Sequence, residues 1–273
     1  MALRINTNVT AMTAMRHMHA SSRSLEDTSR RLSSGMRITA ASDDAMGLGI
    51  SERMRADMRG VATAARTAQD GISFLQVADS KLDSIQGLTT RIREIAVQGL
   101  NGTLSTEDIA TLDEEMAALA QEASRLLDDA EFNGTQLFPL SDAEHTLKSG
   151  TEEGDEISVD FSQVNRVGPS LEAQSVSNTT KANRTLAVVD SILEFVGEAR
   201  GEIGSGQNRL DSAIRTLDVR RTNLVASESR IRDADIAQET AQLVKSRILQ
   251  QGGAAVLAQA NAGPNLALSL LGA

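Results

Sequence analysis

The feature that most constrains this fold is a run of branched apolar residues at every seventh position near the C-terminal end. Seven residues follow this period without exception: Val189, Val196, Ile203, Leu210, Leu217, Leu224 and Ile231. Seven residues correspond to about two helical turns, so these side chains share one face of a single long helix. At ~1.5 Å per residue the helix is roughly 60 Å long, and it cannot bury this face against itself. The chain must therefore supply partner helices for an intrachain coiled-coil seam.

The first half of the chain contains three candidate partner helices. Apolar residues recur mainly in steps of three and four over 5–32, 50–92 and 109–130. We expect the first helix to end at Gly35 and the second to continue through Asp70-Gly71, because the seam crosses that dipeptide without a change of phase.

Turn signals bound the third of these helices. Gly99-Leu-Asn-Gly102 is expected to end the second helix, and Ser105 followed by Asp108 resembles a capping box at the start of the third. Asn133-Gly134 is expected to close the third helix.

The middle of the chain has a different pattern. Residues 157–162 alternate apolar and polar, which is typical of a half-buried strand, and Gly150 and Gly154 before them predict a β-hairpin. Residues 165–183 lack a clear period and are interpreted as a loop. The three prolines, Pro139, Pro169 and Pro264, are expected to lie outside the helices.

Composition narrows the fold class and the function. Aromatic residues make up 2% of the chain, which favours narrow Ala, Leu and Ile seams between helices over one thick aromatic core. The formal charge of -10 disfavours general nucleic-acid binding, and no apolar run reaches the roughly 18 residues that would span a membrane. No cleavable secretory signal is visible at the start of the chain. The fold class predicted is mainly α, a long antiparallel coiled-coil-like bundle formed by both termini, with a small β-hairpin insert.

No catalytic, cofactor or metal site is predicted. The chain has no cysteine and no His-Glu-x-x-His motif. His17 and His19 are two residues apart, so on a helix they do not share a face. The acidic pairs Glu114-Glu115 and Asp128-Asp129 diverge in the same way and are interpreted as solvated.

Several short motifs at the ends of the predicted helices resemble those of one family, the bacterial flagellins. The matching segments, in chain order, are Ile5-Asn-Thr-Asn8, Arg31-Leu-Ser-Ser-Gly-Met-Arg-Ile38, Asp43-Asp-Ala-Met-Gly-Leu-Gly-Ile-Ser51, Asp70-Gly-Ile-Ser73, Arg91-Ile-Arg-Glu-Ile-Ala-Val-Gln98, Phe132-Asn-Gly134, Gln207-Asn-Arg-Leu210, Glu228-Ser-Arg-Ile-Arg-Asp-Ala-Asp235, Leu257-Ala-Gln-Ala-Asn261 and Leu270-Leu271. Met46 stands where the family usually has Ala. The resemblance covers nearly the whole chain and implies a minimal flagellin without outer variable domains.

The resemblance implies a domain arrangement and a function. An inner helical domain would comprise 1–42 and 233–273, and a middle domain 43–232, with the hairpin insert at about 135–175. The chain would be exported unfolded, would be secreted, and would polymerise through its terminal helices into the extracellular flagellar filament that acts as a motility propeller. Its implied partners are copies of itself, other flagellins, the export apparatus with its chaperone, and the filament cap and hook-junction proteins. Nucleic-acid binding and membrane insertion are not expected.

The resemblance and the apolar pattern together assign residues to polymerisation. These are Ile5, Val9, Met12, Leu25, Leu32, Ile248, Leu257, Leu266, Leu270 and Leu271. The block at Arg91 also resembles the segment by which the vertebrate flagellin-sensing Toll-like receptor recognises many flagellins. The matching residues are Arg91, Ile95 and Glu115, and Thr90 and Ile95 depart from the usual Gln and Leu.

Two other interpretations remain open on the sequence. A hook–filament junction protein shares the N-terminal helices, although the Leu-Ala-Gln-Ala-Asn and Leu-Leu ending favours a flagellin. A signalling coiled coil, such as a chemoreceptor hairpin, would need a membrane anchor or sensor domain that is not visible here. A role as an immune ligand would follow from the structural one.

Overall fold

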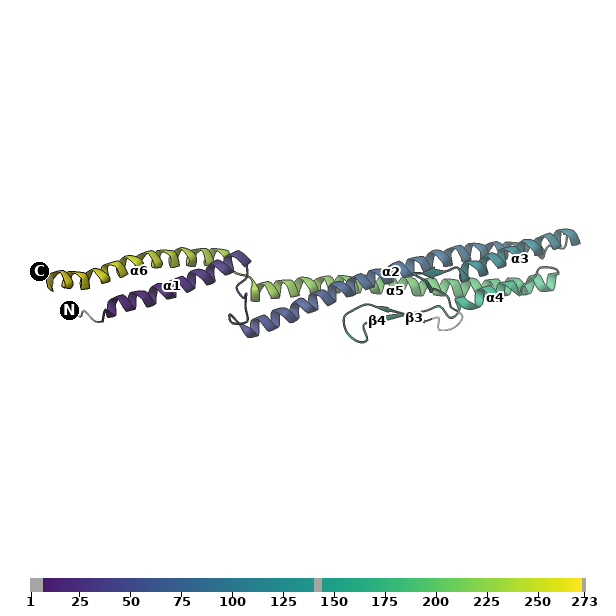
Figure 1. The fold of residues 1–273 in the computed structure, drawn as a ribbon. Coiled ribbons are helices and arrows are strands. Elements are labelled where there is room, and N and C mark those ends of the chain that lie inside the picture. Colours follow the sequence, from purple (N-terminus) through teal and green to yellow (C-terminus); the bar gives the residue numbers. More distant parts are fainter. Residues whose placement is uncertain (1–6, 140–143, 272–273) are drawn as a thin grey trace. The chain divides into compact units, whose positions relative to one another are not determined.

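The computed structural model describes the backbone of residues 7–139 and 144–271, and side chains as far as residue 262. Within that part the fold is mainly helical with small antiparallel hairpins, which confirms the predicted fold class (Figure 1). The elements in chain order are α1 (Val9–Ser34), α2 (Ala45–Gly99), α3 (Thr106–Asp128), β1 (Glu131–Phe132), β2 (Thr135–Gln136), β3 (Glu144–Lys148), β4 (Glu156–Asp160), the 3-10 helix η1 (Val164–Arg166), α4 (Val167–Glu172), α5 (Thr179–Arg232) and α6 (Ile236–Leu271).

The chain forms two compact units, and each contains residues from both halves of the sequence. The first unit comprises 1–58 and 223–273, and the second comprises 59–222. Both limits fall inside helices, in α2 and in α5, and the predicted inner domain of 1–42 and 233–273 falls within the first unit.

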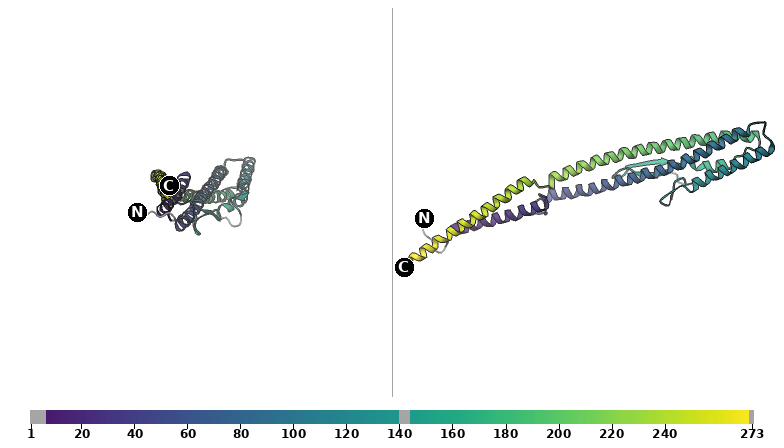
Figure 2. Two further views of the ribbon diagram at one scale, coloured as in Figure 1. Left: turned by 60° about the vertical axis from the view of Figure 1, so that its left-hand side comes forward. Right: turned by 90° about the horizontal axis from the view of Figure 1, so that it is seen from above.

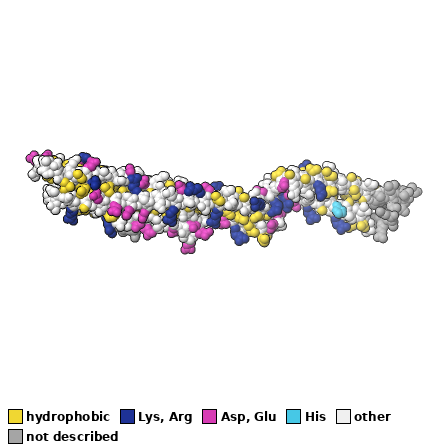
Figure 3. All heavy atoms as spheres, turned by 180° about the vertical axis from the view of Figure 1, so that it is seen from behind, with side chains coloured by type: hydrophobic (Ala, Val, Ile, Leu, Met, Phe, Trp, Pro, Cys, Tyr) yellow, Lys and Arg dark blue, Asp and Glu magenta, His cyan; other side chains and the backbone are white. Residues whose placement is uncertain are grey.

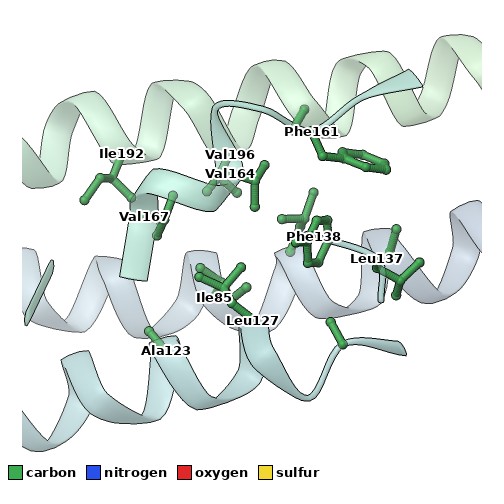
Figure 4. Packing of buried hydrophobic residues seen from close by; sticks show 14 of the residues in the cluster. Ile85, Ala123, Leu127, Leu137, Phe138, Phe161, Val164, Val167, Ile192 and Val196 are labelled. Atoms are coloured by element: carbon green, nitrogen blue, oxygen red, sulfur yellow. The ribbon is translucent and has the colours of Figure 1, made fainter. Parts of the chain in front are cut away.

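The core of the second unit is built around the seven-residue seam of α5. Five seam residues are buried there: Val189, Val196, Ile203, Leu210 and Leu217. All of them except Leu217 join α2 residues such as Leu75 and Ile85 in one apolar cluster, part of which is drawn in Figure 4. Leu224 and Ile231 belong to the first unit and are half-buried.

A polar position in the same seam is used for an ion-pair network. Arg200 of α5 donates to Asp79 Oδ1 and Gln86 Oε1 of α2 over 2.9 and 2.7 Å, and its Nη1 lies 2.9 Å from Asp83 Oδ1. Hydrogen bonding to Asp79 is the main cause that raises the pKa of Arg200, so the guanidinium stays charged. This polar seam position therefore ties α5 to α2.

The predicted helix limits are largely reproduced by local chemistry. Gly35 ends α1 in the left-handed region with φ of 69°, and α2 continues through Gly71 to Gly99. Ser105 and Asp108 form the predicted capping box, in which each side chain accepts a hydrogen bond from the other residue's backbone N–H. The Ser105 hydroxyl also donates to Asp108 Oδ2 over 2.7 Å, and this bond is the main cause that lowers the pKa of Asp108, ahead of the bond from the Ser105 backbone N–H.

Asn133-Gly134 has a different role from the one predicted. Helix α3 already ends at Asp128, and Asn133 and Gly134 form the two-residue turn between β1 and β2. Both residues have positive φ, at 51° and 77°, which a two-residue hairpin turn of this twist requires.

The β3–β4 hairpin covers the second unit's core through aromatic side chains. Ile157 and Val159 of β4 are buried and alternate with exposed residues, as the sequence predicted. The His145 ring lies 5.0 Å from Phe74 and 5.8 Å from Phe161 between centroids, and its Nε2 is 2.9 Å from the carbonyl of Leu137. Phe138 and Phe161 meet edge to face at 5.2 Å (Figure 4).

The segment after the hairpin was predicted as a loop, and that prediction was wrong. Residues 164–172 form η1 and α4, and Val164, Val167, Leu171 and Val176 are buried in the core. Two prolines also lie inside helices: Pro169 in the first turn of α4, where a missing N–H is not needed, and Pro264 in α6.

Candidate assembly surface on the terminal helices

Helices α1 and α6 lie side by side in the first unit, so the two ends of the chain are paired (Figure 2). Asn8 fixes the start of this pair. Its Oδ1 accepts from the backbone N–H of Ala11 over 3.0 Å and caps α1, while its Nδ2 donates to the carbonyl of Ala260 in α6 over 2.8 Å.

The seam between α1 and α6 consists of small and polar side chains. Ala11, Ala14 and Thr28 of α1 and Ser246 of α6 are its buried members. The hydroxyls of Ser24 and Ser246 are 3.1 Å apart, and Gln250 Nε2 donates to Ser22 over 3.3 Å. Such a seam brings the helices close together and buries little apolar area.

Large apolar side chains of the pair face solvent instead. Val9 and Met12 are each 62% exposed and Ile248 is 61% exposed, although burial would favour all three. Figure 3 shows hydrophobic side chains on the visible surface of this pair, among polar and charged ones.

Helix α6 contacts α1 with one face and exposes apolar side chains on another. Exposed apolar residues recur in steps of four, three, four and seven: Ala237, Ala241, Val244, Ile248 and Ala255. This spacing keeps them on one stripe. Residues on the α1 side, such as Ser246 and Gly253, fall between these positions, and Gly253 faces Met18 of α1. A helix with such an exposed apolar face needs a second partner besides α1.

The structure describes the side chains of six of the residues predicted to act in polymerisation. Val9, Met12 and Ile248 are exposed on the pair, and Leu25, Leu32 and Leu257 are half-buried between or beside the helices. Leu266, Leu270 and Leu271 belong to α6, but their side chains lie outside the described part of the chain, as does Ile5 altogether. Val244 and Val256 are also exposed but were not among the predicted residues, although the period of the α6 stripe includes Val244.

Arg232, at the end of α5, bonds to α2 and to the loop after α1. Its Nη1 donates to Glu52 Oε1 over 2.7 Å, and hydrogen bonding to Arg232 is the main cause that lowers the pKa of Glu52. The backbone N–H of Arg37 donates to the Arg232 carbonyl over 2.6 Å, and Met36 bridges Asp233. These bonds join the loop after α1 to the end of α5.

The loop that leads into α2 is closed by an aspartate. Asp43 Oδ2 accepts from the backbone N–H groups of Thr39 and Ala40 and from the Thr39 hydroxyl. These bonds, those from Thr39 above all, lower the pKa of Asp43. The loop is therefore ordered by its own hydrogen bonds.

The three residues matched to receptor recognition lie in the second unit. Arg91 donates to Glu115 Oε1 of α3 through Nη2 at 2.8 Å and to Glu94 Oε2 through Nη1 at 2.9 Å. Hydrogen bonding to Glu115 is the main cause that raises the pKa of Arg91. Arg91 and Glu115 are exposed, whereas Ile95 is buried in the core. The Ile95 side chain is therefore not part of the surface that Arg91 and Glu115 present.

The described residues include no arrangement suited to catalysis or metal binding. No group of three or more His, Asp or Glu side chains within them is placed to hold a metal ion. His17 and His19 are exposed on α1, and His145 packs against phenylalanines. Of the helices searched over the described residues, none is long and apolar enough to cross a membrane.

Comparison with family models connects these features to known proteins. Residues 5–142 match the bacterial flagellin N-terminal helical region, and residues 186–271 match the bacterial flagellin C-terminal helical region. A flagellin of Halalkalibacterium halodurans is 40% identical over 98% of this chain and 99% of its own length. The flagellar filament 33 kDa core protein of Treponema phagedenis is 36% identical over the same shares.

Solved structures show the same fold at lower identity. The Bacillus cereus flagellin crystal structure aligns at 24% identity with a TM-score of 0.50, over 60% of this chain and 94% of that one. A putative flagellar hook-associated protein from Vibrio parahaemolyticus aligns at 16% identity with a TM-score of 0.57, over 70% of this chain and 100% of that one.

Proposed function

This chain belongs to the bacterial flagellin family and is a structural subunit of the flagellar filament, and we propose that it polymerises through the exposed apolar faces of α1 and α6. Flagellins are structural proteins, so no enzymatic step is involved. The observation that carries the proposal is that the α1–α6 pair buries small and polar side chains and exposes large apolar ones. The exposed apolar residues are Val9, Met12, Val244 and Ile248.

The free energies involved favour association along a whole helix face over association through a single side chain. Full burial of one Val, Ile or Met side chain contributes about 1.5–3 kcal/mol. Association costs about 4–15 kcal/mol in lost freedom of motion, so several such side chains must be covered together. The stripe of α6 supplies them in one row. Contact between unlike faces of successive copies, with a rotation that does not close, gives an open helical polymer.

The finer steps of the function belong to the same proposal. The subunit leaves the cell unfolded through the flagellar export apparatus with a chaperone, and joins a filament bounded by cap and hook-junction proteins. The small, polar seam of the α1–α6 pair supports this route, because the pair gains little from burial until neighbouring subunits cover it.

We also propose that Arg91 and Glu115 form the surface that the vertebrate flagellin-sensing Toll-like receptor contacts. Support comes from their exposure and from the 2.8 Å ion pair that presents them together. Arg91→Ala and Glu115→Ala are expected to reduce receptor signalling by soluble subunits, and an unchanged response would contradict this role.

The test of polymerisation is electron microscopy of negatively stained protein after seeding with filament fragments. The full-length chain is expected to form long tubes, and a chain truncated after Arg232, which lacks α6, is expected to stay soluble. Full-length protein that stays monomeric on authentic seeds would overturn the proposal and favour the hook–filament junction role, which binding to hook ends would then test.

A matched pair of point variants separates the terminal helices from the rest of the surface. Ile248 in α6 and Val219 in the second unit are almost equally exposed, at 61% and 62%. Ile248→Ser is expected to raise the critical concentration for polymerisation by tenfold or more, and Val219→Ser by much less. Equal effects of the two variants would contradict a dominant role for α6.

A further inference from the structure

The methionines of this chain are concentrated in one part of the molecule. All but Met116 of the nine lie within residues 1–58, and thus in the first unit. Helix α1, the loop after it and the first part of α2 contain all of these except Met1, which lies outside the described residues. Their distribution is not explained by helix formation alone, because Leu has a similar helix propensity and similar volume.

Three of these methionines expose much of their side chains to solvent. Met46, the second residue of α2, is 77% exposed, and Met12 and Met15 lie three residues apart on the outer side of α1 at 62% and 45%. Met116, in the core of the second unit, is 1% exposed. Dissolved oxidants can therefore reach the first three residues, whereas Met116 is shielded.

Met12 and Met15 have opposite environments in the free subunit and in the polymer. In the free subunit Met12 and Met15 contact water, and in the polymer the apolar side of α1 is covered by a second copy. This step rests on the proposed function. Such a methionine is accessible to oxidants before the polymer forms, and it must be apolar once the polymer covers it. Oxidation of the free subunit can therefore affect assembly.

We propose that Met12, Met15 and Met46 are an oxidation site that controls incorporation of the free subunit into the polymer. The co-reactant is a peroxide. A lone pair of the thioether sulfur attacks one peroxide oxygen, the O–O bond breaks, and an S=O bond forms. Sulfur loses two electrons, the peroxide is reduced, and with hydrogen peroxide the departing hydroxide takes up the proton released and leaves as water.

The sulfoxide changes the side chain from apolar to polar without changing the charge. Its S=O oxygen accepts hydrogen bonds, and water supplies them in the free subunit. When a neighbouring helix covers this surface, the oxygen loses its water, and an apolar face such as the α6 stripe with Val244 and Ile248 offers no donor in exchange. Oxidised subunits should therefore remain folded in the second unit and fail to add to filaments.

The experiment compares peroxide treatment before and after polymerisation. Free subunits are treated with dilute hydrogen peroxide, the peroxide is removed with catalase, and sulfoxide at each methionine is measured by peptide mass spectrometry. Met12, Met15 and Met46 are expected to oxidise well before Met116. The critical concentration for seeded polymerisation should rise by tenfold or more. Filaments formed before treatment should show protection of Met12 and Met15.

Two controls connect the effect to these three sulfurs. The two methionine sulfoxide reductases, one for each sulfoxide epimer, should together restore polymerisation. The triple variant Met12→Leu, Met15→Leu, Met46→Leu keeps apolar volume and cannot be oxidised there, so it should polymerise equally well with and without peroxide. Met116→Leu should leave the peroxide sensitivity unchanged.

The outcomes separate this inference from the proposed function. Untreated wild-type protein that does not polymerise on seeds would contradict the proposed function itself. Wild-type protein that carries sulfoxide at all three positions and still polymerises normally would overturn only the oxidation site. The same holds if the triple Leu variant polymerises but remains sensitive to peroxide. If the Leu variant does not polymerise even when untreated, restoration of the wild-type protein by the reductases decides the question.

Discussion

The side-chain amide of Asn8 donates over 2.8 Å to the carbonyl oxygen of Ala260, the same carbonyl that Pro264 leaves without its helical donor. In an α-helix the N–H of residue 264 would bond to the carbonyl of residue 260, and proline has no N–H. Asn8, the N-cap residue of α1, thus supplies the hydrogen bond that Pro264 removes from α6. This relationship explains how α6 accommodates a proline while it stays paired with α1.

Asn8→Asp separates the two functions of that side chain. Aspartate can still accept from the Ala11 N–H, so the cap of α1 is kept, but the donor to Ala260 is lost. We expect faster hydrogen exchange in α6 around Ala260 in polymerised protein, with little change at the start of α1. Asn8→Ala should also lose the cap, which contributes about 0.5–2 kcal/mol. Asn178→Ala, which removes the corresponding cap of α5, should leave α6 unchanged.

Leu210→Ala should destabilise the second unit strongly. Leu210 is buried in the α5 seam and faces Gly71 of α2, so truncation leaves a cavity between the helices. Core substitutions of this kind cost about 2–5 kcal/mol in the free energy of unfolding. Chemical denaturation of the free subunit measures this loss. Leu224→Ala, at a half-buried position of the same period, should cost clearly less, and an equal loss would contradict a core limited to the second unit.

The hairpin turn at Asn133 makes a prediction about backbone conformation. Asn133 has φ of 51°, which a β-branched residue adopts only at a cost, so Asn133→Val should destabilise the unit by about 1–2 kcal/mol. Asn133→Gly, which accepts this φ freely, should be close to neutral. Denaturation of both variants beside the wild type checks the prediction, and a harmless Asn133→Val would argue against the two-residue turn.

The Glu52–Arg232 pair should make the first unit sensitive to acid. The pKa of Glu52 is lowered in the folded state, chiefly by hydrogen bonding to Arg232. Its contribution is therefore fully present above the ordinary glutamate value of 4.5 and is lost as the pH falls through the lower folded value. We expect the protection factors of amides at the end of α5, which correct for the intrinsic pH dependence of exchange, to fall as the pH is lowered through the folded value in the wild type. Glu52→Gln should show faster exchange already at neutral pH and a weaker acid dependence, whereas Glu114→Gln should behave as wild type.

The long helices of this fold could be predicted from the sequence because their apolar residues recur at a regular spacing and because specific residues mark the helix ends. Seven seam residues on one face require a long helix, and Gly35 and Ser105 mark helix ends by chemistry that acts within a few residues. The strand at Ile157 was also visible, since its two buried residues alternate with exposed ones. These signals are local, and tertiary contacts did not have to override them.

The parts that were missed depend on contacts distant in sequence. Helix α4 is six residues long and contains a glycine and a proline, so its own pattern is too short to show a period, and it is held by burial of Val167 and Leu171 in the core. Asn133-Gly134 marks a turn correctly, but the pattern does not say whether a helix or a hairpin flanks it. On α6, the apolar stripe is visible in the sequence, while its exposure depends on which face α1 already covers.

The gathering of phenylalanines around the β3–β4 hairpin has a practical optical consequence. The chain contains no tryptophan and no tyrosine, and all of its five phenylalanines except Phe195 lie in the contacts that surround His145, Phe74 and Phe161. The near-ultraviolet circular dichroism of the native protein therefore arises almost entirely from this one cluster. A single tryptophan placed elsewhere, for example in α6, would add a signal with no background, so hairpin packing and terminal-helix docking can be followed at separate wavelengths in one sample.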